Sequence, residues 1–183
     1  MAAFSPSATD APIRPAKLAH LVLRTAQFDE IVDWWSTVLH LEVRHGSPFV
    51  AFLTYDDEHH RLAILNDPNL RPNDRGTAGF EHVAFTYDSL DDLLATYVRL
   101  KEAGITPIAP INHGMTLSLY YADPDGNQCE LQVDTMSVAE AEAFMASPVF
   151  EANPIGVPYD PDDLVARRAA GESVEALTAY TPI

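Results

Sequence analysis

The chain has 183 residues, of which 47% are hydrophobic and 21% are charged, a composition typical of a globular protein with ample material for a core. Its formal net charge of −16 at pH 7 argues against a nucleic-acid partner or an anionic membrane surface, because both attract clustered Lys and Arg. No apolar stretch approaches the ~20 residues of a membrane span, and Met1 to Ala11 lacks the basic and apolar regions of a signal peptide. We therefore expect a cytoplasmic protein.

The order of apolar and polar residues predicts a first unit that begins near Lys17. Residues 1–16, rich in Pro, Ala and Ser, are expected to form a flexible arm ahead of it. A strand near Leu18–Arg24 precedes a helix over Phe28–Leu39, whose apolar residues recur at helical spacing. The Pro- and Gly-containing segment Asp67–Gly79 is a linker. Between helix and linker the pattern indicates three strands, near Leu41–Arg44, Phe49–Tyr55 and His60–Asn66.

A second unit repeats this order. A strand over Phe80–Thr86 leads to a helix over Ser89–Ala103, with Asp88 or Ser89 as the N-cap and Gly104 as the left-handed residue that ends the helix. Three more strands are expected near Thr106–Ala109, Met115–Tyr121 and Gln128–Val133. The chain is therefore predicted to be an α+β protein with two tandem βαβββ units.

The last two predicted strands are joined by the turn Asp123–Asn127. A hairpin centred on Asp125 would set Tyr120 opposite Glu130 and place both side chains on one face of the sheet. A slip of one residue in the register would undo this pairing.

Beyond Asp134 the pattern becomes helical. Ser137 and Glu140 have the spacing of a capping box, and Asp160-Pro161 opens a second short helix with proline at its first position. Residues 135–183 carry too many apolar side chains for a disordered tail. We expect this C-terminal helical extension to cover the mouth of a pocket or to contact a second chain.

Three residues form the candidate metal site. His20 and His82 occupy matching positions in the two units, 62 residues apart, and Glu130 lies in the last strand of the second unit. A lone histidine in a strand is more often structural, but two repeat-related histidines together with a carboxylate in an apolar strand favour a ligand set. A buried, unpaired carboxylate is costly unless a cation lies beside it. Two imidazoles and one carboxylate are the facial triad that suits non-haem Fe(II).

The duplicated βαβββ plan with these three residues resembles the vicinal oxygen chelate superfamily over roughly residues 17–134, with units 17–67 and 79–134. Within it, the chain is similar to the small one-domain type I extradiol catechol dioxygenases. The run His59-His60-Arg61-Leu62-Ala63 resembles the strand that holds the family's acid/base histidine, which maps to His60. The run Tyr120-Tyr121-Ala122-Asp123-Pro124 resembles the stretch that holds the family's tyrosine, which maps to Tyr120. His113 lies where larger members carry a further active-site histidine.

This resemblance implies an open, cup-like mixed sheet around a metal site that holds Fe(II), with Mn(II) as the alternative. It also implies a small-molecule catechol and O2 as substrates, ring opening to a hydroxymuconic semialdehyde-type product, and a homodimer or larger homo-oligomer. Tyr120 and His113 would orient the substrate. His60 would act as base and acid, since an imidazole titrates near neutral pH.

Glyoxalase I relatives use a fourth ligand, a glutamate in the last strand of the first unit, and Arg61–Asn66 contains none. Two other functions remain open at this point. A three-ligand thiol transfer with Mn(II), as in fosfomycin-resistance relatives, is the alternative enzyme. A metal-free binding protein of the bleomycin-resistance kind is the alternative of a different class. Biphenyl-type diols, simple catechols and L-DOPA-like catechols are all compatible with the sequence.

Overall fold

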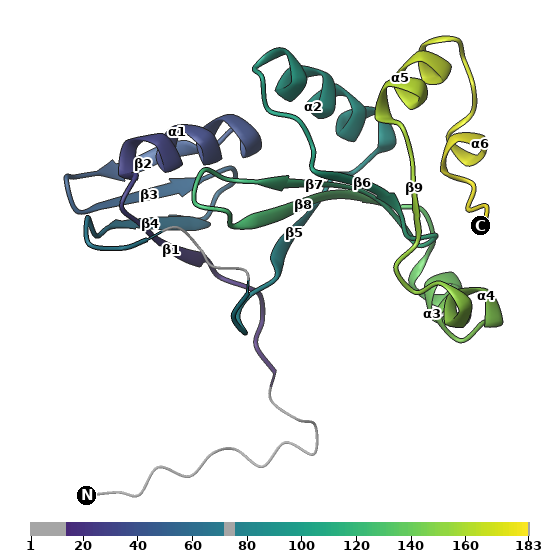
Figure 1. Ribbon diagram of the computed structural model, residues 1–183, viewed down its shortest axis with the longest axis horizontal. Coiled ribbons are helices and arrows are strands. Elements are labelled where there is room, and N and C mark those ends of the chain that lie inside the picture. Colours follow the sequence, from purple (N-terminus) through teal and green to yellow (C-terminus); the bar gives the residue numbers. More distant parts are fainter. Residues whose placement is uncertain (1–13, 72–75, 183) are drawn as a thin grey trace, which may run out of the picture.

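The first of two sheets is built by the first unit. The computed structural model describes residues 14–71 and 76–182, so most of the predicted arm (1–16) lies outside the described residues (Figure 1). The sheet has the order β1-β4-β3-β2, with β1 parallel to β4 and the other pairs antiparallel. Its elements are β1 (Leu21–Thr25), α1 (Phe28–Leu39), β2 (Glu42–Gly46), β3 (Val50–Thr54) and β4 (Leu62–Asn66).

The second sheet repeats this strand order and adds one strand from the C-terminal extension. Its order is β5-β8-β7-β6-β9, with β5 parallel to β8. The α+β class and the duplicated βαβββ plan are thus confirmed. The chain forms two open sheets, and β1 and β5 are each an edge strand of one of them. The elements are β5 (His82–Thr86), α2 (Leu90–Glu102), β6 (Ala109–Asn112), β7 (Thr116–Ala122), β8 (Gln128–Asp134) and β9 (Val157–Pro158).

The core lies between the sheets and the helices that cover them on one side. Figure 1 shows α1 over the first sheet and α2 over the second, both on the same side. Strand alternation sends Leu119, Tyr121, Cys129 and Leu131 into this core, where all four are fully buried. The side chains between them, including Tyr120 and Glu130, therefore point to the opposite side, which we call the open face.

Local signals set most element ends. The Ser89 hydroxyl accepts a hydrogen bond from the Asp92 N–H at the start of α2, and Gly104 follows the helix with a φ of 79°. The predicted strand at Thr106–Ala109 is misplaced: β6 runs over Ala109–Asn112, because its pairing with β7 joins Ala109 to Tyr120 and Asn112 to Leu117.

The C-terminal extension packs on the second unit. It contains four helices where the sequence predicts two, because Ser147 and Ser173 each cap a helix of only five residues. Leu164 and Leu177 are buried in the core, and the Arg168 guanidinium donates to both carboxylate oxygens of Asp91 on α2. No helix in the described part of the chain combines the length and apolarity needed to cross a membrane. The helices are α3 (Val138–Met145), α4 (Pro148–Ala152), α5 (Pro161–Ala169) and α6 (Val174–Thr178).

A buried carboxylate joins the two units. The Trp35 indole of α1 donates to Asp123 Oδ2 over 3.0 Å, and the backbone N–H groups of Asp125 and Asn127 donate to Asp123 Oδ1 over 3.0 and 2.8 Å. Asp123 is 4% exposed, and its donors Trp35 and Asp125 are buried as well. The same carboxylate therefore shapes the turn that sets the β7–β8 register and fixes that turn to the first helix.

Asp123→Ala should destabilise the fold by about 1–3 kcal/mol, because it leaves buried N–H donors unsatisfied. The free energy of unfolding in urea is the measurement. Asp57→Ala, at an exposed acidic position in the first unit, is the matched control and should change it by less than ~0.5 kcal/mol. Equal effects of the two substitutions would contradict the joining role of Asp123.

Candidate active site

One group of functional side chains lies on the open face of the second sheet. His82 is the first residue of β5, and Glu130 lies in the middle of β8, the strand paired with it. The His82 Nε2 atom is 3.0 Å from Glu130 Oε2. The Glu130 side chain is 7% exposed, whereas that of His82 is 32% exposed. A carboxylate so deeply buried needs a positive or hydrogen-bonding neighbour, and His82 supplies one.

Tyr120 and His113 complete this group. The predicted hairpin register is confirmed, with Tyr120 directly opposite Glu130. The His113 Nε2 atom lies 3.0 Å from the Tyr120 hydroxyl and 4.0 Å from Glu130 Oε1. Burial, and then the nearby Glu130 carboxylate, raise the pKa of Tyr120 above its ordinary value, so its hydroxyl stays protonated as a donor. We call His82, His113, Tyr120 and Glu130 the Glu130 cluster.

A second group lies in the first unit. His20, immediately before β1, has its ring centroid 4.4 Å from that of His60. Phe52 on β3 lies 4.8 Å from His60, and the Nδ1 atoms of His59 and His60 are 2.6 Å apart. Burial, and then the neighbouring His20 and His59, lower the pKa of His60. It is therefore neutral near pH 7, the form that accepts a proton. We call His20, Phe52, His59 and His60 the His60 cluster.

The two clusters are separate within one chain. Throughout residues 14–71 and 76–182, no three His, Cys, Asp or Glu side chains come close enough together to hold a metal ion. Of the three predicted ligands, His82 and Glu130 are in contact, and His20 is instead in contact with His60. The chemistry of the donor set fits Fe(II), and each cluster presents a part of it.

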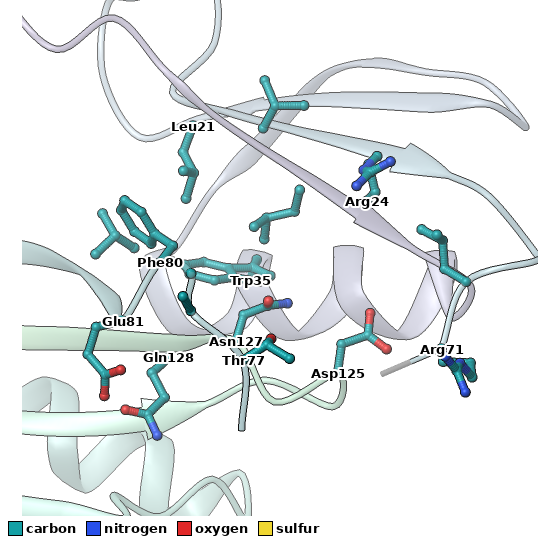
Figure 2. A pocket seen from close by; sticks show the side chains of 16 residues that line it. Leu21, Arg24, Trp35, Arg71, Thr77, Phe80, Glu81, Asp125, Asn127 and Gln128 are labelled. Atoms are coloured by element: carbon teal, nitrogen blue, oxygen red, sulfur yellow. The ribbon is translucent and has the colours of Figure 1, made fainter. Parts of the chain in front are cut away.

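A cavity of about 520 Å³ lies where the two units meet. Figure 2 shows it between β1, which contributes Leu21 and Arg24, and the second unit, which contributes Phe80 and Asp125. None of the predicted site residues lines this cavity. β1 and β5 both contribute side chains to this cavity, and in the described residues the two strands are not paired with each other.

Three residues in or beside the clusters are not among the predicted site residues: Phe52, His59 and Asn112. Phe52 lies between the buried Ala51 and Leu53, so strand alternation could have placed it on the open face. Asn112, beside His113, is 5% exposed. The sequence does not show that its amide is buried, so only the structure draws attention to it. All six predicted site residues belong to one of the two clusters.

The two open sheets with their duplicated βαβββ order define a class of fold, and comparison with known proteins agrees. Residues 17–131 match the Glyoxalase/Bleomycin resistance protein/Dioxygenase superfamily, and the chain belongs to this superfamily. A glyoxylase/bleomycin resistance protein/dioxygenase domain from Frankia has a TM-score of 0.58 and 16% identity, over 70% of this chain and 99% of that one. Lactoylglutathione lyase from Agrobacterium tumefaciens has a TM-score of 0.53 and 18% identity, over 65% and 94%.

Among curated proteins, the chain resembles two from Rhodococcus globerulus. Biphenyl-2,3-diol 1,2-dioxygenase 2 is 46% identical over 166 residues, 90% of this chain and 87% of that protein. Biphenyl-2,3-diol 1,2-dioxygenase 3 is 39% identical over 88% of this chain and 87% of that protein. Alignments of this length include most of the residues beyond Asp134. The alignment with a lactoylglutathione lyase from Neisseria meningitidis, at 26% identity, covers only 62% of the chain.

Proposed function

We propose that this protein is an extradiol dioxygenase. It adds both atoms of O2 to a catechol-type diol and opens the ring beside the two hydroxyl-bearing carbons, giving a hydroxymuconic semialdehyde-type product. The observation that carries this proposal is the Glu130 cluster, in which a buried carboxylate touches His82 and lies beside the Tyr120–His113 pair. The two Rhodococcus relatives support a biphenyl-2,3-diol-like substrate, because they align with about nine-tenths of the chain.

We assign His20, His82 and Glu130 as ligands of Fe(II), with Mn(II) as the alternative ion. When bound, the metal supplies one centre at which both diol oxygens and O2 come together, since three protein ligands leave adjacent positions open. Burial of Glu130 favours a cation next to it, because an isolated carboxylate is costly in a low-dielectric site.

The other residues bind the diol and move protons. The Tyr120 hydroxyl, held in its protonated form, donates a hydrogen bond to a substrate oxygen, and His113 orients that hydroxyl from 3.0 Å. His60 lies beside His20 and is neutral near pH 7, so it accepts a proton from the diol and returns it during ring opening. Phe52 packs against the His60 ring and limits its rotation.

The triad is completed, in this proposal, by a second copy of the chain. His20 and the pair His82–Glu130 do not meet in one chain. In the described residues, β1 pairs only with β4 and β5 only with β8, so each sheet ends in a strand with an unused edge beside its histidine. Val22 and Phe80, each two residues along the chain from its histidine, are 46% and 71% exposed.

A symmetric dimer that lays β1 of one chain beside β5 of the other uses both edges and covers these apolar side chains. Each of its two equivalent sites would take His20 and His60 from one copy and the Glu130 cluster from the other. Burial of apolar surface and pairing of the free backbone groups would both stabilise such a dimer. In it, the two clusters that are separate in one chain would form a single site.

The proposal is tested by loading the purified protein with Fe(II) without oxygen and then adding 2,3-dihydroxybiphenyl and ¹⁸O2. One O2 should be consumed per diol, and the ring-opened product should carry both labelled atoms. Catechol and L-DOPA in parallel rank the substrate classes. Absence of oxygen consumption with every diol, or a product with a single labelled atom, would overturn the proposed function.

Tyr120→Phe should raise the KM for 2,3-dihydroxybiphenyl about tenfold and leave the metal content unchanged, since it removes one hydrogen bond to the substrate. Steady-state kinetics and metal analysis measure the two quantities. Tyr121→Phe is the matched control, because the neighbouring Tyr121 side chain is fully buried on the other face. A KM that rises equally in both variants would remove Tyr120 from the site.

A further inference from the structure

The C-terminal extension holds the residue that precedes His113. The Asn112 side chain donates from Nδ2 to the Thr178 carbonyl, at the end of α6, over 3.1 Å. Its Oδ1 accepts the Gly114 N–H over 2.8 Å, so the same side chain also closes the turn around His113. The backbone of Asn112 pairs with Val157 of β9. Asn112 is 5% exposed, and both of its side-chain bonds are therefore shielded from water.

The extension also contacts the residue that follows His113. Gly114, with a φ of 87°, lies against the Phe144 ring of α3: a Cβ at this position would come within 2.5 Å of Phe144 Cζ. The Phe144 ring packs in turn on Phe150 of α4 and on Tyr180, with centroids 5.6 and 5.5 Å apart. Thr135 donates to the Gly114 carbonyl over 2.5 Å. The extension thus contacts both residues that flank His113 in the chain, Asn112 and Gly114.

A glycine in the connector brings β9 close to Asn112. Gly156 has a φ of 95°, and a Cβ there would lie 2.3 Å from the Asn112 carbonyl oxygen. Only a glycine allows the chain to pass at this distance in this conformation. The extension therefore contacts the His113 loop through four residues: Thr135, Phe144, Gly156 and Thr178.

We propose that Asn112 is a positioning residue, through which the C-terminal extension sets the place of His113 and hence of the Tyr120 hydroxyl at the diol. This inference rests on the proposed dioxygenase function. The coverage of the comparisons agrees with it, because the alignments with the two biphenyl-2,3-diol dioxygenases extend through most of the extension, whereas the lactoylglutathione lyase alignment leaves a larger part of the chain unmatched.

Asn112→Asp separates the two bonds of this side chain. The aspartate keeps an oxygen that accepts the Gly114 N–H, but it cannot donate to the Thr178 carbonyl. We expect the KM for 2,3-dihydroxybiphenyl to rise about tenfold, with kcat changed less than about threefold. Asn66→Asp in the first unit is the matched control and should leave the KM unchanged, because it likewise loses a bond from an asparagine Nδ2 to a backbone carbonyl, that of Pro48, outside both clusters.

A double-mutant cycle separates positioning from a general loss of stability. If Asn112 acts through His113, the variant Asn112→Asp/His113→Ala should have the same KM as His113→Ala alone, since the two effects share one cause. The proposal would be overturned if the two single-variant effects on KM multiplied in the double variant, or if Asn112→Asp had the native KM. If Asn112→Asp does not fold, Leu177→Ala, which loosens α6 away from His113, takes its place in the cycle and is decided by the same outcomes.

A readout without turnover distinguishes this inference from the proposed function. In metal-free protein, the imidazole ¹H–¹⁵N correlations of His113 should shift in Asn112→Asp, and those of the exposed His45 in the first sheet should not. Unshifted His113 signals would overturn the positioning role even in an active enzyme. If the His113 signals shift in Asn112→Asp while the wild-type protein consumes no O2 with any diol, the positioning role is supported and the dioxygenase function is rejected.

Discussion

His60→Ala is expected to lower kcat by roughly 10²- to 10⁴-fold while the protein keeps its metal, because this is the range of a single general acid/base group. The His60 ring lies 4.4 Å from that of His20 and packs on Phe52, so it is held beside the proposed metal without being assigned as a ligand. Its lowered pKa keeps the ring neutral and ready to accept a proton. Oxygen consumption with 2,3-dihydroxybiphenyl and metal content per chain are measured on the same sample.

The matched control for this prediction is His45→Ala. His45 is an exposed histidine of the same sheet, with its ring 5.9 Å from that of Phe52. It should leave kcat within about threefold of the native value, as expected for a surface substitution. Near-native turnover in His60→Ala would remove His60 from the chemistry. Loss of the metal in that variant would instead make His60 a ligand.

Much of the fold is predictable because its signals are local and periodic. The helix over Phe28–Leu39 has the same ends in sequence and structure, since three turns of amphipathic spacing define it. The turn around Asp125 fixed the register that places Tyr120 opposite Glu130. The helices α4 and α6 are not predicted, because five residues are too few to establish a period; a capping serine marks each start, followed in α4 by Pro148.

The site was predictable in its parts and not in its assembly. The repeat indicates that His20 and His82 occupy equivalent strands, and the hairpin brings Glu130 to Tyr120. Which strand lies beside the outer edges of β1 and β5 depends on backbone pairing between distant segments or between chains, and no side-chain pattern specifies it. For this reason the sequence predicts one triad, whereas the chain presents a two-ligand part and a one-ligand part.

In the proposed dimer, His20→Ala, His82→Ala and Glu130→Ala should each abolish metal binding, because a homodimer of any one variant lacks one of the three proposed ligands at both sites. His45→Ala should keep the native metal content. Inductively coupled plasma mass spectrometry after Fe(II) loading gives metal per chain, and native mass spectrometry confirms that each variant is still dimeric. Undiminished binding in all three variants would overturn the triad.

A mixed dimer of His20→Ala and His82→Ala chains, purified through two different affinity tags, tests whether the site is shared. If His20 of one copy meets His82 and Glu130 of the other, one of the two sites in this heterodimer takes both of its histidines from unmutated positions. It should then bind about one metal per dimer and recover about half of the native turnover, although neither parent homodimer does either. If all three ligands came from one chain, each site in the heterodimer would lack one histidine. A heterodimer without metal would therefore reject the two-chain site and require the two sheets of a single chain to close on each other when the metal binds.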